Sequence, residues 1–205
     1  MSDLVNTTLL TSAFVTLFVI MDPVGTVPIF LSLTGGRSQR SARRAAWQAV
    51  AVSFVVITGF AFFGQRILDY LHISLAALQC AGGLLLLLIS LELLTGNEKE
   101  QVATAGTNVA MVPLGTPLLA GPGAIVATML YSRRVHDFAD FSAVALAVVL
   151  VHLCIWAAMR FSLPILRLIR ETGVLLVTRI AGLLLSAIAV QLVADGVRAF
   201  IAGEG

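Results

Sequence analysis

The feature that most constrains this chain is a series of long segments without charged side chains. A helix that crosses the hydrocarbon core of a bilayer needs roughly 20 mostly apolar residues. Segments that meet or nearly meet this requirement are residues 4–36 (in which Asp22 is the only charge), 45–65, 70–91, 101–132 and 141–159. A further segment, 180–194, is shorter but continues upstream through the apolar residues 174–178. We therefore predict an all-α membrane protein with six transmembrane segments.

Composition excludes the common soluble classes. Apolar residues make up 59% of the 205 residues and charged residues only 12%, whereas soluble domains carry about 25% charged residues. A cytosolic enzyme, a disordered tail and a nucleic-acid-binding protein are therefore not expected. Cys80 and Cys154 lie in apolar runs, and the three histidines are scattered, so neither a disulfide nor a metal site is indicated. We expect no cofactor, and the lipid bilayer as the main partner.

The basic residues are divided unevenly between the two ends of the predicted segments. Loops rich in Lys and Arg stay on the cytoplasmic side of a membrane. The odd-numbered loops would hold nine basic residues: Arg37, Arg40, Arg43, Arg44, Lys99, Arg160, Arg167, Arg170 and Arg179. The opposite side would hold four: Arg66, Arg133, Arg134 and Arg198. This asymmetry predicts that both termini lie outside.

The first and fourth segments exceed one crossing, and both contain strong helix breakers. Proline removes a backbone donor, and glycine permits backbone conformations that other residues avoid. Backbone groups freed by such a break cannot face lipid, so the break must be buried or line a wet cavity. The residues that we assign to a substrate or coupling-ion site on this ground are Asp22, Pro23, Gly25, Thr26 and Pro28 in the first segment, and Thr116, Pro117, Gly121, Pro122 and Gly123 in the fourth.

The sequence also repeats itself at a spacing of about 100 residues. Residues 81–85 match 181–185, and at a spacing of 99 Pro23 aligns with Pro122. We predict a single membrane domain with one repeat at about 4–96 and a second at about 104–201. Because each repeat holds three segments, the two must run through the membrane in opposite directions. Broken helices at corresponding places of inverted repeats are typical of a transporter's central site.

A physical picture of this site follows from the breaks. Asp22 followed by Pro23 has the form of a helix N-cap and first turn, and Gly121–Pro122 can do the same in the other half. Each break would then present the positive end of a half-helix, which favours a carboxylate or another small anion. Asp22 supplies a negative charge suited to an ammonium group, a proton or a cation. A zwitterionic solute fits both signs; the alternative is that Asp22 is only a structural cap.

Three stretches resemble the MarC family of bacterial inner-membrane proteins. Met21–Thr34 resembles the family's signature, Pro117–Ile125 its second motif, and Arg179–Leu185 its last span. The resemblance covers essentially the whole chain and implies location in the bacterial cell (inner) membrane. Some relatives are treated as transporters of small neutral amino acids, and the family is grouped with exporters such as the lysine exporters. The residues carried over by resemblance are Asp22, Pro23, Gly25, Pro28, Gly121, Pro122 and Gly123.

The functional hypothesis is secondary transport of small neutral amino acids such as alanine, glycine or serine, by alternating access at the broken helices. No Walker-type nucleotide loop is present, so proton or ion coupling is expected in place of direct use of ATP. No enzymatic activity is expected. Two alternatives stay open: an exporter of other small metabolites or drugs, and a non-transporting membrane protein. The sequence does not determine the oligomeric state, the direction of transport or the solute.

The remaining intramembrane polar residues and glycines have simpler interpretations. Gly82, Gly83 and Gly182 are expected to let helices approach closely. His152 lies near the middle of the fifth segment, where a helix-packing histidine competes with a proton-relay role. Glu92 follows the uncharged run 70–91 and is expected at the cytoplasmic interface, with a relay role as the alternative.

Overall fold

The computed structural model describes residues 5–34, 38–95 and 119–203, and within these ranges all regular secondary structure is helical. Thr116 and Pro117 lie outside the described residues. The helix α8 is interrupted at Arg170, whose backbone angles (φ 60°, ψ 166°) are not helical. The helices are α1 (Thr7–Met21), α2 (Thr26–Thr34), α3 (Gln39–Leu71), α4 (Leu75–Thr95), α6 (Pro122–Ser132), α7 (Phe138–Arg160) and α8 (Ser162–Ile201).

Four of these helices are long and apolar enough to cross a membrane: α3, α4, α7 and the part of α8 over Leu175–Ile201. The helix α1 has 15 residues and α6 has 11, which correspond to lengths of about 22 and 16 Å. Both are shorter than the roughly 30 Å hydrocarbon core. The described residues therefore contain four full-length candidate spans and two shorter apolar helices, where the sequence predicts six segments.

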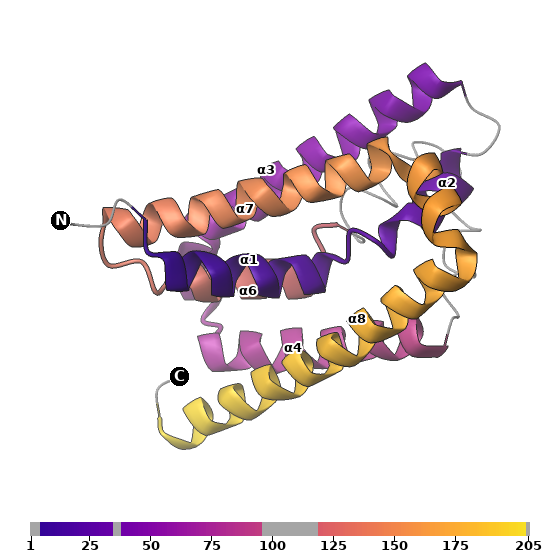
Figure 1. The fold of residues 1–205 in the computed structure, drawn as a ribbon. Coiled ribbons are helices and arrows are strands. Elements are labelled where there is room, and N and C mark those ends of the chain that lie inside the picture. The colour runs from indigo at the N-terminus through magenta and orange to yellow at the C-terminus, as the bar shows by residue number, and fades with distance from the viewer. Residues whose placement is uncertain (1–4, 35–37, 96–118, 204–205) are drawn as a thin grey trace.

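The helices are arranged in three tiers (Figure 1). The helices α3 and α7 form one outer tier, α1 and α6 lie in the middle, and α4 and α8 form the other outer tier. The amino end of α1 and the carboxyl end of α8 lie at the same end of the molecule, which we call the terminal end. The helix α2 lies at the opposite end, where the first part of α8 turns toward it. The middle tier is thus enclosed by helices on both sides.

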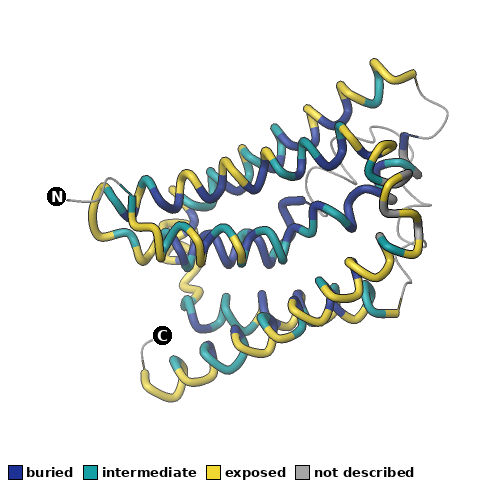
Figure 2. Tube along the Cα trace, in the orientation of Figure 1, coloured by how far each residue is buried: buried dark blue, intermediate teal, exposed yellow. Residues whose placement is uncertain are grey.

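Burial follows this arrangement. In Figure 2 the buried parts of the trace concentrate on the middle tier and on the inner faces of the outer helices. Seven of the 11 residues of α6 are buried, from Gly123 to Tyr131. The main hydrophobic cluster joins α1, α2, α3, α6 and α7, and it uses many alanines, including Ala46, Ala49 and Ala127. Small side chains at helix contacts let the helices approach one another closely.

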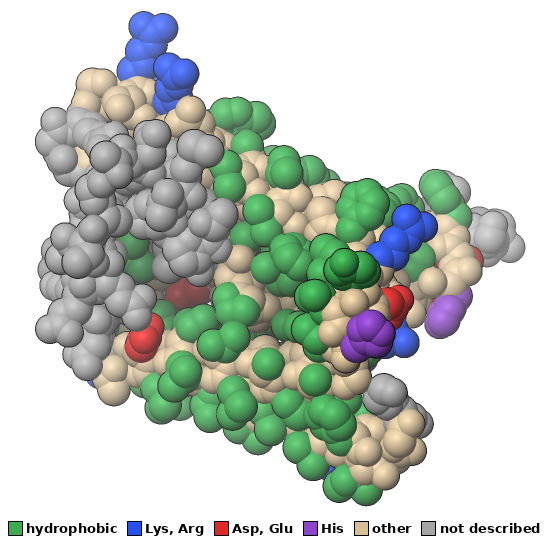
Figure 3. Space-filling model, turned by 180° about the vertical axis from the view of Figure 1, so that it is seen from behind, with side chains coloured by type: hydrophobic (Ala, Val, Ile, Leu, Met, Phe, Trp, Pro, Cys, Tyr) green, Lys and Arg blue, Asp and Glu red, His purple; other side chains and the backbone are tan. Residues whose placement is uncertain are grey.

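The outer surface is that of a membrane protein. Figure 3 shows hydrophobic side chains over most of the described surface along the helices, with basic, acidic and histidine side chains gathered toward the two ends. Large apolar side chains such as Phe62, Leu88 and Leu183 are more than half exposed. Exposed apolar surface on this scale is unfavourable in water and favourable in lipid.

Polar caps determine where several helices begin. The Asn6 side chain accepts a hydrogen bond from the Leu9 amide (3.1 Å) at the start of α1, and Asp137 Oδ1 accepts one from the Asp140 amide (2.8 Å) at the start of α7. The two starts are also joined to each other. Asn6 Nδ2 donates to Asp140 Oδ1 (2.9 Å), and the His136 amide donates to Asp140 Oδ2 (3.2 Å). These bonds hold the amino ends of α1 and α7 together.

Glycines allow α4 and α8 to pack closely. A Cβ added at Gly83 would lie 2.7 Å from the backbone oxygen of Ala189 and 2.7 Å from Val193 Cγ2. One added at Gly182 would lie 3.2 Å from Leu93 Cβ on the other helix. A Cβ added at a third glycine, Gly196, would lie 2.9 Å from the Ala76 carbonyl oxygen. These glycines line one antiparallel helix pair along its length, as the sequence analysis expects for Gly83 and Gly182.

Candidate solute site at the helix breaks

Asp22 joins α1 to α2 and has two roles in the backbone there. It ends α1 in a left-handed conformation (φ 35°), with its amide donating to the Phe18 carbonyl. Its carboxylate Oδ1 accepts a hydrogen bond from the Gly25 amide (3.0 Å), and its carbonyl accepts from the Thr26 amide (3.0 Å) and the Thr26 hydroxyl (2.9 Å). A side chain that accepts from the third residue after it is the pattern of an N-cap. Asp22 therefore bonds the turn that leads into α2, which begins at Thr26, whereas the Asp-Pro pair predicts a helix that begins at Pro23.

The second carboxylate oxygen of Asp22 is different. Oδ2 is buried and has no hydrogen-bond partner among the described residues. A buried acceptor without a partner is costly, and a charged one more so. The explanations for such an atom in a native structure include backbone strain, a bound water or ion, and a role in function. Oδ2 is thus the carboxylate oxygen at the first break that is available to accept a further hydrogen bond.

Gly25 makes this arrangement possible. A Cβ at this position would overlap Asp22 Oδ2 and would lie 3.3 Å from the Thr178 hydroxyl of α8. Thr178 is itself buried, with 5% of its surface exposed. The carboxylate and the Thr178 hydroxyl therefore face the same small space beside Gly25. A residue larger than glycine would fill that space.

The second break opens α6 without a side-chain cap. Gly121 is the N-cap residue in an extended conformation (φ −65°, ψ 162°), and Pro122 is the first helical residue. No side chain of the N-cap residue bonds the first turn, because glycine has none. The first amides of a helix have no partner within the helix, and they carry the positive end of its dipole. Gly121 and Gly123 are both buried, so this end is enclosed by protein.

The two breaks share one part of the core. Met21, Leu119, Ala120 and Ala124 belong to the same buried cluster. In Figure 1, α2 and α6 both begin toward the middle of the molecule, and they lead to opposite ends of it. Two half-helix amino ends are therefore directed toward the centre. The Asp22 carboxylate bonds the turn before one of them, and within the described residues the N-cap residue of the other makes no side-chain cap.

The helix α4 closes one side of this region through reciprocal glycine contacts. A Cβ at Gly123 of α6 would overlap Leu86 of α4, while a Cβ at Gly82 of α4 would lie 2.6 Å from Val126 Cγ2 of α6. Each helix thus places a bulky side chain against a glycine of the other. Gly82 and Gly123, which the sequence analysis assigns to packing and to the site respectively, meet in one interface.

Not every residue singled out from the sequence joins this region. The backbone of Pro28 lies in the first turn of α2. Glu92 is half-buried in the last turn of α4. His152 is buried between α3 and α7, where Ser53 Oγ lies 3.2 Å from Nε2 and the Val148 carbonyl lies 2.7 Å from Nδ1. Phe54 packs edge-on against the same imidazole. Both ring nitrogens of His152 have protein partners, an arrangement that suits helix packing.

A cluster of three hydroxyl groups on the terminal side of the breaks was not predicted from the sequence. The Tyr131 hydroxyl of α6 lies 2.9 Å from both the Ser12 and the Thr16 hydroxyls of α1. The available signal was the i, i+4 spacing of Ser12 and Thr16, which places both on one face of α1. Nothing in the linear sequence pairs that face with Tyr131, because their contact depends on the packing of the middle tier.

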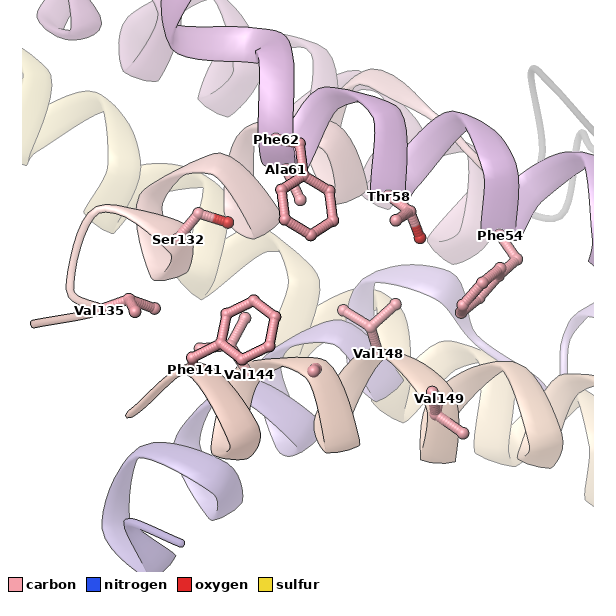
Figure 4. A pocket seen from close by; sticks show the side chains of 11 residues that line it. Phe54, Thr58, Ala61, Phe62, Ser132, Val135, Phe141, Val144, Val148 and Val149 are labelled. Atoms are coloured by element: carbon pink, nitrogen blue, oxygen red, sulfur yellow. The ribbon is translucent and has the colours of Figure 1, made fainter. Parts of the chain in front are cut away.

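The structure also contains an apolar pocket of about 240 Å³ between α3 and α7. Figure 4 shows Phe62 of α3 and Phe141 of α7 pointing into it, with ring centroids 6.3 Å apart. Thr58 and Ser132 contribute hydroxyls, and no charged side chain lines it. Phe62 and Phe141 are exposed on the outer surface. This pocket therefore suits an apolar occupant and cannot provide the charges that a zwitterion needs.

The fold and the site together define a multi-pass helical integral membrane protein with broken helices near its centre. The profile of MarC family integral membrane proteins matches residues 7–201. The chain therefore belongs to the MarC family. Two of its similar relatives are a UPF0056 membrane protein of Methanocaldococcus jannaschii (36% identical, covering 91% of this chain and 94% of the relative) and the UPF0056 membrane protein YhcE of Escherichia coli K12 (31% identical, covering 93% and 92%).

A third relative is a UPF0056 membrane protein of Aquifex aeolicus, 33% identical over 93% of this chain and 92% of the relative. These names describe membrane proteins and state no solute. No solved structure matches the chain significantly.

Proposed function

We propose that this protein is a secondary transporter of small neutral amino acids, such as alanine, glycine or serine, that operates by alternating access at the two helix breaks. The observation that carries the proposal is the pair of complementary groups at the breaks. Among the described residues, Asp22 Oδ2 is a buried acceptor without a partner, and the buried amino end of α6 begins at a glycine that provides no side-chain cap. An ammonium group suits the first and a carboxylate suits the second.

The proposed binding mode uses this difference between the two half-helices. At the start of α2, Oδ1 of Asp22 is held by the Gly25 amide, which fixes the carboxylate and leaves Oδ2 for the ammonium group. At the start of α6, the amides after Pro122 are directed at the substrate carboxylate. No bond is made or broken in this cycle. A proton or a cation is the expected coupling partner, and Asp22 is the residue through which it would act.

The contacts between helices support two inverted repeats. At an offset of 99 residues, α2 corresponds to α6, α3 to α7 and α4 to α8. The helix α2 contacts α7 and α8, and its counterpart α6 contacts α3 and α4. In Figure 1, α3 and α7 run in opposite directions, as do α4 and α8. Ser53 and His152 occupy equivalent positions at this offset and are hydrogen-bonded to each other, as residues on a two-fold axis would be. We infer six membrane segments, of which the first and fourth are broken.

The glycine-packed pair α4–α8 is the unit that we expect to move. Its two helices are joined to each other along their length, while α4 meets α6 through the contacts of Gly82 and Gly123 with Val126 and Leu86. Rocking of one closely packed unit against the rest is a common form of alternating access. Such a motion would expose the breaks to one side of the membrane and then to the other.

The first prediction concerns Asp22→Asn. Asparagine keeps an oxygen for the Gly25 amide but loses the negative charge, so ammonium and cation binding should fail. We expect proteoliposomes with wild-type protein to take up labelled L-alanine saturably, with a dependence on an imposed proton or cation gradient. Uptake by Asp22→Asn should fall to near background.

The matched control is Asp69→Asn. Asp69 is exposed at the end of α3 and accepts a hydrogen bond from Gln65 (2.9 Å), so its substitution should leave uptake unchanged. Thermal stability and gel filtration should show that all three proteins are folded. Saturable uptake that persists in Asp22→Asn would reject the assigned site. An absence of alanine, glycine and serine uptake by folded wild-type protein would reject the solute class and favour an exporter of other metabolites. A loss of folding alone in Asp22→Asn would favour a non-transporting role.

A further inference from the structure

A second cavity lies between α1, α6 and α8 on the terminal side of the breaks, with a volume of about 350 Å³. Thr16 of α1 and Tyr131 of α6 line one wall. Gln191 and Asp195 of α8 line the facing wall, and Arg134, just after α6, completes the polar lining. The rest of the lining is apolar: Ala127, Leu130, Ala187, Ile188 and Leu192. Unlike the pocket between α3 and α7, this cavity contains charges of both signs.

The polar groups on the α1–α6 wall are held in place by one another. The Tyr131 hydroxyl lies 2.9 Å from the Ser12 and Thr16 hydroxyls. The Arg134 guanidinium lies 5.4 Å from the centre of the Tyr131 ring, in a cation–π arrangement. Within the described parts of the chain, this guanidinium has no carboxylate partner. Its planar donors are thus available for a bidentate contact with a carboxylate.

The polar groups on the α8 wall are arranged for the opposite charge. Asp195 Oδ1 accepts a hydrogen bond from Gln191 Nε2 (2.8 Å) and lies 3.8 Å from Arg198. Both contacts come from its own helix, so they hold the carboxylate without bridging the cavity. The Asp195 carboxylate and the Arg134 guanidinium line the same cavity but do not form an ion pair with each other. The cavity therefore offers a cation and an anion, which suit the carboxylate and the ammonium group of a zwitterion respectively.

An apolar layer separates this cavity from the breaks. Leu130, Ile188 and Leu192 line the cavity. The same residues pack in one cluster with Ile20, Leu185 and Ala189. Ile20 is two residues before Asp22, so the cluster lies between the cavity and the first break along α1. In this conformation the cavity is therefore an outer chamber, closed from the central site by aliphatic side chains.

We propose that this chamber is a distinct binding site for a zwitterionic amino acid on the terminal side of the membrane, with Arg134 receiving the carboxylate and Asp195 with Gln191 receiving the ammonium group. The proposal rests on the proposed function for its solute class, but not on transport itself. The chamber captures the solute before the aliphatic layer opens toward the breaks.

The test measures binding separately from transport. L-Alanine is titrated into detergent-purified wild-type protein, Asp22→Asn, Arg134→Gln and Asp195→Asn by isothermal titration calorimetry. Wild type and Asp22→Asn should both bind alanine, because the chamber does not include Asp22. Arg134→Gln and Asp195→Asn should each weaken binding to this site by about tenfold or more, since each removes a charge-assisted hydrogen bond.

One matched control is Arg133→Gln, because Arg133 is exposed and does not line the chamber. The other is Asp69→Asn, which removes the carboxylate of a similar hydrogen-bonded Gln–Asp pair on α3. Both should bind as wild type does. Propionate, which lacks the ammonium group, and alanine methyl ester, which lacks the carboxylate, should bind weakly to wild type. In proteoliposomes, Arg134→Gln and Asp195→Asn should raise the KM for alanine and retain most of Vmax.

The chamber proposal and the transport proposal fail in different ways. If Asp22→Asn abolishes transport while Arg134→Gln and Asp195→Asn keep the wild-type affinity and KM for alanine, the chamber proposal is overturned. The transport proposal then stands. If Asp22→Asn still binds alanine through Arg134 and Asp195 but wild-type protein takes up no alanine, the chamber proposal is supported. Transport of alanine is then rejected. An absence of alanine binding by folded wild-type protein would overturn the chamber.

Discussion

At the scale of single residues, the two tyrosines of this chain show how position changes the contribution of a hydroxyl group to stability. Tyr131 is nearly buried, and its hydroxyl joins α6 to Ser12 and Thr16 of α1. Tyr70 lies at the end of α3 with 83% of its surface exposed. A buried hydrogen bond contributes about 0.5–1.5 kcal/mol net, and an exposed hydroxyl exchanges freely with water. The same chemical change should therefore have different effects at the two sites.

We expect Tyr131→Phe to lower the free energy of unfolding by about 0.5–1.5 kcal/mol, and Tyr70→Phe to leave it unchanged. Reversible unfolding of the purified protein in detergent, followed by circular dichroism, provides the measurement. Equal effects of the two substitutions would contradict the assigned hydrogen bonds.

At the scale of elements, close approach of helix backbones distinguishes glycines that look alike in the sequence. A Cβ at Gly83 would meet the backbone of α8, including the Ala189 oxygen at 2.7 Å and the Val193 nitrogen at 3.0 Å. Backbone atoms cannot move aside as the end of a side chain can. A Cβ at Gly59, in the middle of α3, would meet nothing within 4 Å. The first glycine is therefore required by packing and the second is not.

Gly83→Ala should force α4 and α8 apart and lower the free energy of unfolding by about 1–3 kcal/mol, the usual cost of overpacking. Gly59→Ala should be neutral or stabilising by up to about 1 kcal/mol, because alanine is the better helix former. Chemical or thermal denaturation in detergent compares the two variants directly. Tolerance of Gly83→Ala with wild-type stability would mean that α4 and α8 do not pack as closely as described.

At the scale of the whole molecule, the arginine cluster at the start of α3 lies at the end of the molecule opposite the amino end of α1 and the carboxyl end of α8. The amino end of α3, with Arg40, Arg43 and Arg44, lies away from the terminal end. From this arrangement the positive-inside rule predicts that the α3 end lies in the cytoplasm and both termini lie outside. In this predicted orientation the proposed outer chamber would face outward and would capture solute from outside the cell.

Cysteine labelling tests this orientation in intact cells. The two native cysteines are first replaced, and single cysteines are introduced as Gly203→Cys near the carboxyl terminus and Gln39→Cys at the start of α3. A membrane-impermeant maleimide should label position 203 without permeabilisation and position 39 only after it. The reverse pattern would invert the topology, and labelling of both positions in intact cells would contradict the placement of the two at opposite membrane faces.

The sequence by itself determined the class of this protein and the positions of its breaks. Long uncharged segments leave a chain no alternative to helices in lipid, because every backbone group must be bonded within its own segment. In the described residues α1 ends before Asp22–Pro23 and α6 begins at Gly121–Pro122, through the local chemistry of these residues. The family followed from the same residues, since its motifs surround these breaks.

Only the tertiary structure decided which polar groups at those breaks have hydrogen-bond partners. Whether Asp22 Oδ2 has a partner, and whether Thr178 lies beside Gly25, depends on how α8 packs against α2, which no local pattern encodes. The outer chamber has the same origin. Arg134 and Asp195 are 61 residues apart in the sequence, and each resembles an ordinary charge at a helix end until α6 and α8 bring them to facing walls. Local breaks are set by backbone sterics, whereas binding sites are set by the packing of distant helices.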